Sequence, residues 1–353
     1  MSLGSRLRAA RAAAGLSLRE LSDRVPVSHT AIANYEKDAD VPSSAVLIAL
    51  ADATGVDMGF LFRSSNVELG SPAWRKRKAL TKTEERSILA KTQDVLERYF
   101  EVEHLLGSEP GAFRVDLALS PVTSVEDAER VAEELRTGWQ LGLDPIDDVT
   151  ELLEGRGIRI VYVEASDAFD GCTLVANGSI PVVVINSRFP GDRRRLSLAH
   201  ELAHVVMDVR DDVDLERAAQ RFAGAFLFPA QMVLEELGSH RSNLDIYELH
   251  LLKHRWGLSM QSIIFRVQQT GVIGESRAKS LFFLFGKKGW KRREPGDPYP
   301  EEEPRRFQRL VMKALAEDAV SRSKASELLG MSFEDFRRSV AAAHGADLVG
   351  LCD

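Results

Sequence analysis

The 353-residue sequence predicts a protein of the α+β class, mainly α-helical with a small β-sheet. Apolar residues recur at helical spacing through residues 4–62 and again through residues 193–228. Three runs rich in β-forming residues, 158–163, 172–176 and 181–185, predict the strands of the sheet. A chain of this length corresponds to two or three domains, each able to bury its own core.

Breaks in these patterns divide the chain into four predicted segments. Residues 1–65 form a compact set of about five short helices, and residues 66–110 form a helical linker. Residues 111–275 hold the small sheet and the strongest helices. Residues 276–353 form a C-terminal helical region for packing or dimerisation, within which residues 280–285 predict a further strand.

Composition excludes several classes of protein. The chain lacks a run of 18 apolar residues and an apolar stretch near its N-terminus, so we expect a cytoplasmic protein without a membrane partner. Its two cysteines, Cys172 and Cys352, are too few for a disulfide framework or a thiolate metal cluster. The net charge is −7, but five arginines outweigh two acidic residues in the first 24 positions, and this local excess is compatible with DNA binding.

The N-terminal helices contain a candidate helix-turn-helix, with residues 18–24 as its first helix and residues 28–35 as its second. In such a motif the second helix enters the major groove, and its exposed polar side chains contact base edges. The candidates for base contacts are Ser28, His29, Thr30 and Asn34, and those for phosphate contacts are Arg6, Arg11 and Arg19. By spacing alone, an ordinary helical bundle with a polar surface fits equally well.

The run "SRLRAARAAAGLSLRELSDRVPVSHTAIANYEKDADVPSSAVLIALADATGV" resembles the Xre and phage-repressor helix-turn-helix family over its whole length. The resemblance implies a five-helix repressor-like domain that binds a double-stranded DNA operator, and we expect it to act as a homodimer. Leu18 departs from the family, which often carries Gln at this position near the DNA backbone.

A second motif, His-Glu-x-x-His, indicates a metal site. His200 and His204 are four residues apart, so on a helix they project from one face and can bind one Zn²⁺. Glu201 follows the first histidine and can act as general base towards a zinc-bound water. The motif occurs by chance in roughly one chain in a hundred of this size. The alternative is a pair of histidines inside an ordinary core.

Catalytic zinc needs a third protein ligand. The extended motif with a third histidine is absent from the sequence, and Glu216, in the first turn of the next predicted helix, is the better candidate. Asp211, Asp212 and Asp214 compete with it, although a solvated loop with helix-capping acids explains these three.

The runs "RRRLSLAHELAHVVM", "ERAAQRFAGAFLFPA" and "PVVVIN" resemble the ImmA/IrrE family of zinc metallopeptidases, which implies a zincin-like domain. In that family the Glu of a Glu-x-x-Ala-x-x-Phe-Ala helix is the third ligand, and this motif maps onto Glu216, Ala219, Phe222 and Ala223. Gln220 stands where the family often has Asn or Asp, which could alter metal affinity if that residue orients a ligand histidine.

Together the motifs predict a transcriptional regulator whose DNA-binding module is coupled to a zinc peptidase that cleaves itself or a partner repressor. A second hypothesis makes the metallopeptidase-like domain a non-catalytic ligand or stress sensor. A third is a free-standing peptidase that uses its N-terminal helices for protein contacts only.

Other assignments rest on weaker signals. A substrate peptide could align along the edge of the strand 182–185. The candidates for the residue that stabilises the oxyanion, by residue type only, are His240, Tyr247, His250 and His254. Near the C-terminus, the pattern resembles a second helix-turn-helix, with Ser323 as a helix cap and Gly330 as the turn. We interpret this segment as a packing or dimerisation element.

Overall fold

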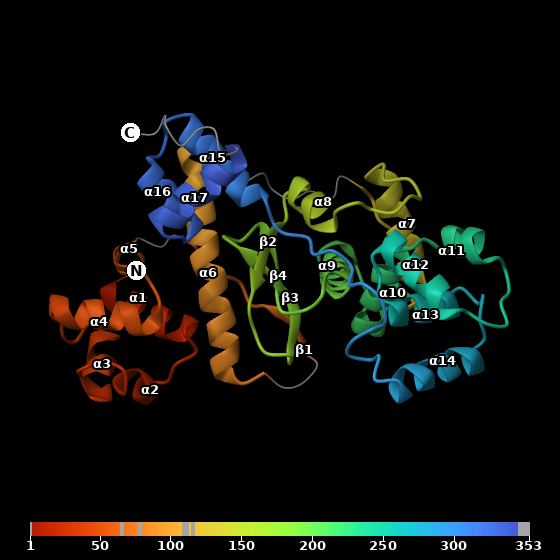
Figure 1. Ribbon diagram of the computed structural model, residues 1–353, viewed down its shortest axis with the longest axis horizontal. Coiled ribbons are helices and arrows are strands. Elements are labelled where there is room, and N and C mark those ends of the chain that lie inside the picture. The colour runs from red at the N-terminus through yellow and green to blue at the C-terminus, as the bar shows by residue number, and fades with distance from the viewer. Residues whose placement is uncertain (1, 64–66, 77–79, 108–112, 114–116, 345–353) are drawn as a thin grey trace. The chain divides into compact units, whose positions relative to one another are not determined.

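The computed structural model describes residues 2–63, 67–76, 80–107, 113 and 117–344 (Figure 1). The chain forms two compact units. The first comprises Met1–Leu69, Leu80–Ala112 and Arg305–Asp353, and the second comprises Gly70–Ala79 and Phe113–Pro304. The mainly helical α+β class predicted from the sequence is confirmed.

Five short helices open the first unit, as predicted. They are α1 (Leu3–Ala13), α2 (Leu18–Ser22), α3 (His29–Tyr35), α4 (Ser44–Thr54) and α5 (Met58–Phe62). Their common core includes Leu7, Leu21, Ile32 and Leu50, each at most 5% exposed. Burial of these side chains at helical spacing packs the short helices into one bundle, although each is too short to be stable alone.

Local capping fixes where these helices begin. Ser17 and Glu20 form a capping box at the start of α2, and the Ser28 Oγ accepts a hydrogen bond from Ala31 N at the start of α3. Ser43 and Asp57 cap α4 and α5 in the same way. The side-chain oxygens satisfy backbone N–H groups that have no partner within the helix.

The rest of the first unit is built around α6 (Lys82–Leu105), whose N-terminus carries a capping box made by Thr81 and Glu84. Three C-terminal helices complete it, and two of them, α15 and α16, pack on α6 (Figure 1). They are α15 (Arg306–Ala316), α16 (Arg322–Leu329) and α17 (Phe333–His344). Gly330 ends α16 with a left-handed backbone, as predicted, but the cap of α16 is Ser321 and not Ser323.

A buried ion pair joins α1 to α6. The Arg6 Nη1 atom lies 2.6 Å from Glu97 Oε2, and both side chains are at most 3% exposed. The Arg6 Nε also donates a hydrogen bond to the main-chain oxygen of Arg63, 2.8 Å away. The helix predicted as a linker is therefore packed against the N-terminal helices.

The second unit contains a four-stranded sheet in the order β1-β3-β4-β2. Its strands are β1 (Ala73–Lys76), β2 (Arg159–Val163), β3 (Phe169–Ala176) and β4 (Ile180–Asn186). β4 pairs parallel with β2 and antiparallel with β3, and β1 pairs antiparallel with the other side of β3. Every residue of β4 is buried, as expected of a central strand.

Among its described residues, the second unit also contains eight helices. They are α7 (Asp127–Gly138), α8 (Val149–Gly155), α9 (Gly191–Val206), α10 (Leu215–Leu227), α11 (Ala230–Leu237), α12 (Ile246–Trp256), α13 (Met260–Gln269) and α14 (Glu275–Lys287). Helix α9 packs on β3 and β4, and α10 packs on both α9 and α7 (Figure 1). This layer of helices holds the core on one side of the sheet.

Three expectations from the sequence are wrong. Residues 280–285 form part of α14 and not a strand, because Ala278, Leu281 and Phe285 recur at helical spacing and are all buried. The strand 182–185 has no free edge, since β4 is paired on both sides. Residues 73–76, expected in the linker, form the edge strand β1.

In the part of the chain that the structure describes, no helix is both long and apolar enough to cross a bilayer.

We expect Glu97→Ala to destabilise the first unit by about 3–5 kcal/mol, because it leaves the Arg6 guanidinium buried without its carboxylate. Urea unfolding followed by circular dichroism measures the change. Glu334→Ala, which removes an ion-pair partner that is 85% exposed in the same unit, is the control and should leave the unfolding curve unchanged. Equal effects of the two substitutions would contradict the structural importance of the buried pair.

Candidate metal centre and nucleic-acid interface

Helix α9 carries the His-Glu-x-x-His motif through the core of the second unit. The helix begins after Pro190, has Asp192 in its first turn and ends at Val206. Its apolar positions Leu198, Ala199, Leu202 and Ala203 are fully buried. His200, one turn before His204, is therefore presented from a helix whose position is fixed by packing.

Helix α10 brings the third side chain. Asp214 caps this helix through a hydrogen bond from Arg217 N to its Oδ1, which places Glu216 in the first turn. Ala219 and Ala223, on the buried face of α10, have no exposed surface. Small side chains allow α10 to approach α9 closely, so Glu216 reaches the histidines.

The three side chains converge. The Nε2 atoms of His200 and His204 are 3.2 Å apart. Glu216 Oε2 lies 3.3 Å from the Nε2 of His200, and Glu216 Oε1 lies 3.4 Å from the Nε2 of His204. Hydrogen bonds from the two imidazoles hold the pKa of the Glu216 carboxyl well below its usual range. The residue is therefore ionised, which is the form that binds a cation.

These distances are close to those of a tetrahedral metal site, with a different oxygen of Glu216 nearest to each histidine. Ligand atoms about 2.0–2.1 Å from a central zinc ion, at the corners of a tetrahedron, lie about 3.3–3.4 Å from one another. Two imidazole nitrogens and one carboxylate oxygen are also a donor set that zinc accepts, with one corner left for water or substrate. The geometry thus provides a His-His-Glu group able to hold a metal ion; the role of each residue as a ligand stays a prediction.

Glu201 follows His200 on α9 and is fully buried, in a helix that packs on β3 and β4. The Thr173 Oγ1 on β3 donates a hydrogen bond to Glu201 Oε2 at 2.9 Å, and a Cβ at Gly171 would lie 3.3 Å from Glu201 Oε1. Sequence reasoning missed both residues as neighbours of Glu201, although it placed Thr173 in the predicted strand 172–176. Spacing offered no signal for them, because they meet Glu201 only through the packing of β3 on α9.

Cys172 lies between these two strand residues but is unsuited to nucleophilic chemistry. It has no exposed surface, and burial together with the nearby charge of Glu201 raises the pKa of its thiol. A thiol that stays protonated is neither a nucleophile nor a metal ligand.

A segment from 294 to 304 braces the first half of α9. The Arg195 guanidinium, 1% exposed, pairs with Glu302, which also accepts a hydrogen bond from Thr150 N at 2.9 Å. Arg194 pairs with the flanking acids, Glu301 and Glu303, at 3.0 and 3.1 Å. Gly191 allows the close approach, since a Cβ there would lie 2.1 Å from Pro300 O.

The competing acids are placed differently from Glu216. Among the described residues, the group that could hold a metal ion is His200, His204 and Glu216, without an aspartate. Asp212 pairs with Arg210, and Asp214 caps α10. This agrees with the interpretation of the aspartates as loop and capping residues.

The residues considered for the oxyanion make their observed contacts elsewhere. On α12, the rings of His250 and His254 are 4.6 Å apart, and His254 Nε2 lies 3.3 Å from the Asp297 main-chain oxygen. Tyr247 is 67% exposed, and His240 lies in the exposed turn after α11. Their catalytic assignment gains no support from these positions. Gln220 is half-buried one turn after Glu216, and its effect on metal affinity stays a prediction.

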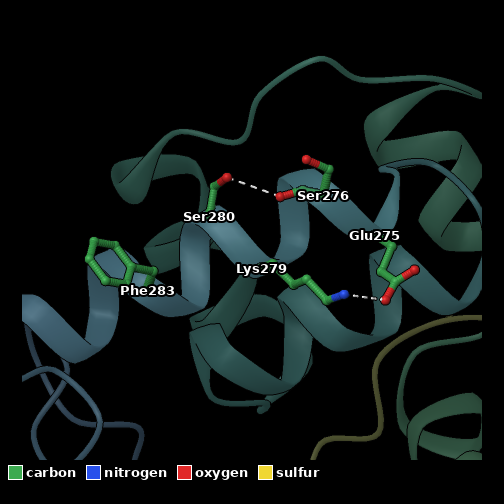
Figure 2. Close-up of a pocket in the computed structure, with 5 residues that line it drawn as sticks. All are labelled: Glu275, Ser276, Lys279, Ser280 and Phe283. Carbon is green, nitrogen blue, oxygen red and sulfur yellow. Dashed lines mark hydrogen bonds and ion pairs between the residues drawn. The ribbon is translucent and has the colours of Figure 1, made fainter.

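A hollow of 670 Å³ lies along the outer face of α14 (Figure 2). It is lined by Glu275, Ser276, Lys279, Ser280 and Phe283. All five residues come from one helix, and two of them are joined by the Lys279 Nζ to Glu275 Oε1 ion pair at 2.6 Å. The hollow shares no residue with the His-His-Glu group and adds nothing to it.

The predicted base-contacting residues lie on or at the start of α3 with exposed side chains. They are Ser28, His29, Thr30 and Asn34. Arg19, on the preceding helix α2, is exposed as well. The arrangement of α2 and α3 as two short helices joined by a tight turn is that of a helix-turn-helix, and contacts with DNA stay a prediction for each residue.

Two of the three predicted phosphate contacts are wrong. Arg6 is buried in its pair with Glu97. Arg11 forms two hydrogen bonds from its guanidinium to the carboxylate of Glu36, at 2.5 and 2.8 Å. The Arg11 guanidinium binds the Glu36 carboxylate in a fork, and Arg6 is buried against Glu97, so both arginines are engaged inside the bundle and are not available to a phosphate.

Two segments of the chain match family models. Residues 2–59 match the family model of a helix-turn-helix domain, and residues 154–268 match that of the IrrE N-terminal-like domain, Peptidase M78. No curated protein matches the chain. A crystal structure of Bacillus thuringiensis PlcR in complex with the peptide PapR7 and DNA aligns over 97% of this chain and 98% of its own, with 12% identity. The TM-score of 0.17 is too low for this likeness to carry an argument.

We expect Glu216→Ala to weaken zinc affinity more than about 100-fold, because it removes one of three charged or basic donors from a preformed site. Competition with a fluorescent zinc chelator measures the affinity, and elemental analysis measures the zinc retained after dialysis. Asp211→Ala removes an exposed acid from the preceding loop and should bind zinc as the unaltered protein does. Full zinc retention by the Glu216 variant would exclude this residue as a ligand.

Proposed function

Since this chain fuses a helix-turn-helix domain to an IrrE N-terminal-like domain, we propose that it is a DNA-binding transcriptional regulator coupled to a zinc-dependent peptidase. The peptidase cleaves the chain itself or a partner repressor in response to a signal. The observation that carries the proposal is the convergence of three side chains: the two histidine Nε2 atoms lie 3.2 Å apart, and each lies 3.3–3.4 Å from one carboxylate oxygen of Glu216. Glu201 follows the first of these histidines in the sequence.

Zinc held by His200, His204 and Glu216 would supply a Lewis acid for the peptide carbonyl and lower the pKa of a water to about 7. Glu201 takes a proton from the attacking water and returns it to the leaving amine, so that the residue acts as general base and then as general acid. The hydrogen bond from Thr173 to Glu201 Oε2 supports this role, because it restrains the carboxylate in one orientation.

The DNA-binding part uses the N-terminal domain. The exposed polar side chains at the start of α3 face base edges, and Arg19 contacts a phosphate. We propose that two copies bind a palindromic operator, with one α3 helix in each half-site. The helix-turn-helix family match and the exposure of these residues support the proposal.

We expect Glu201→Gln to abolish cleavage while preserving zinc and DNA binding, since the amide keeps an oxygen for the Thr173 hydroxyl but cannot accept a proton. Intact-mass spectrometry of the zinc-loaded chain detects self-cleavage, and mapping of new N-termini in expressing cells detects cleavage of other proteins. Glu235→Gln, at an exposed position of α11, is the matched control and should cleave normally.

An unchanged regulatory response in cells that carry Glu201→Gln, together with an unchanged set of N-termini, would reject the peptidase. The result would favour the alternative in which the metallopeptidase-like domain senses a ligand or stress without turnover. Binding a metal and cleaving a peptide make different demands on the surrounding residues, so zinc binding alone does not distinguish the two functions.

For the DNA-binding part, we expect the double variant Arg19→Glu and Thr30→Glu to weaken binding more than about tenfold, because it adds negative charge opposite the phosphates. Gel mobility shifts with a random-sequence duplex of about 30 base pairs measure affinity at several salt concentrations, and loss of one phosphate contact should lower the salt slope by about 1. The control, Arg338→Glu with Ser339→Glu, makes the same charge change on exposed positions of α17. Equal mobility shifts for both double variants would contradict the assigned interface.

A further inference from the structure

The strand β1 covers the side of β3 that faces away from β4. Ala73 lies opposite Thr173, Trp74 opposite Cys172 and Arg75 opposite Gly171 in an antiparallel register. Just before this strand, Gly70 N donates a hydrogen bond to Val175 O at 2.8 Å. Backbone pairing with this chain's own residues therefore extends along most of β3.

The covered edge is the one nearest to Glu201. Gly171 and Thr173 are two residues apart on β3, so they face the same side of the sheet. That side is towards Glu201, as the hydrogen bond from Thr173 and the close approach of Gly171 show. The partners of these two residues are Arg75 and Ala73, so β1 runs along the edge of the sheet beside the proposed general base.

From this arrangement we propose that the outer edge of β3 is the binding site for an extended substrate peptide, and that β1 is the chain's own occupant of that site. Backbone groups on an exposed strand edge bind an extended peptide by adding it to the sheet, in register with the strand. A substrate and β1 need the same N–H and C=O groups of β3, so β1 must leave before the substrate binds. The proposal rests on the peptidase function proposed above.

The form of β1 suits a strand that can be displaced. It has four residues, and its register with β3 shifts between Arg75 and Lys76. Pro72, directly before it, cannot donate a ladder hydrogen bond. Among the described strands, β1 is bonded to β3 alone, whereas β4 is bonded on both sides. A short edge strand with an irregular register has few hydrogen bonds to lose.

The edge of β2 at the other end of the sheet is a poorer candidate for the peptide site. β2 is separated from β3 by β4, and the strand residues that approach Glu201 belong to β3. The sequence had placed the peptide along residues 182–185, but this strand is the central β4. The choice of β3 thus follows from strand order and from the position of Glu201.

The test displaces β1 and measures peptide binding in a Glu201→Gln background, so that cleavage does not interfere. The displacing change is Ala73→Pro with Trp74→Pro. Successive amides of a strand point to opposite edges, so two adjacent prolines remove the donor that faces β3 whichever residue carries it. The matched control, Ala73→Ser with Trp74→Phe, keeps both amides. The probe is a fluorescein-labelled peptide with the sequence of residues 67–76, VELGSPAWRK.

We expect the double-proline protein to bind the probe at least tenfold more tightly than the parent and the matched control, as measured by fluorescence anisotropy. With Glu201 restored, the same two prolines should raise the rate at which the probe peptide is cleaved at least tenfold. Equal probe binding by all three proteins would overturn the proposal.

Hydrogen–deuterium exchange gives a readout that needs no variant. The parent protein should protect the amides of β3 that face β1, and the double-proline protein should lose this protection while α9 and α10 keep theirs. Rapid exchange of these β3 amides in the parent would overturn the proposal. Tighter probe binding without any cleavage would instead reject the peptidase function and leave the peptide-binding edge in place.

Discussion

The close packing of α10 on α9 is the constraint on which the candidate metal centre depends. Two histidines one turn apart on α9 offer two donor atoms, and among the described residues it is Glu216 on the neighbouring helix that brings a carboxylate to them. Fully buried alanines on both helices, among them Ala199 and Ala219, allow this approach. Larger side chains there would separate the helix axes and draw Glu216 away from the tetrahedral spacing.

Most features that depend on residues close together in the chain, such as helices, their caps and strands, could be predicted from the sequence. The caps Ser17, Ser28 and Ser43, the five N-terminal helices and the three strands between 158 and 186 follow from residue spacing and capping chemistry. The positions of His200 and His204 on one helical face follow from the same period. Glu216 was selected through its place in the next helix and through the family resemblance, and its side chain lies beside both histidines.

What the sequence could not give depends on partners that are distant in the chain. Arg6 and Arg11 look like free positive charges until Glu97 and Glu36 are seen beside them. Strand order is not encoded in alternation, so β4 was mistaken for an edge and β1 was missed. The apolar run 281–285 is compatible with a helix or a strand. The burial of one helical face, seen in the structure, shows that it is a helix.

The contacts between α9 and residues 294–304 have a consequence for how the unit that holds the candidate metal centre could be isolated. Residues 154–268 are the part that matches the IrrE N-terminal-like domain, yet Arg195 within this part is neutralised by Glu302, 34 positions beyond its end. A protein that ends at residue 268 would keep every proposed zinc ligand. It would, however, leave the Arg195 guanidinium buried without its carboxylate, on the helix that carries His200 and His204. A folded fragment should therefore extend at least to Glu302, well beyond residue 268, where the match to the family model ends.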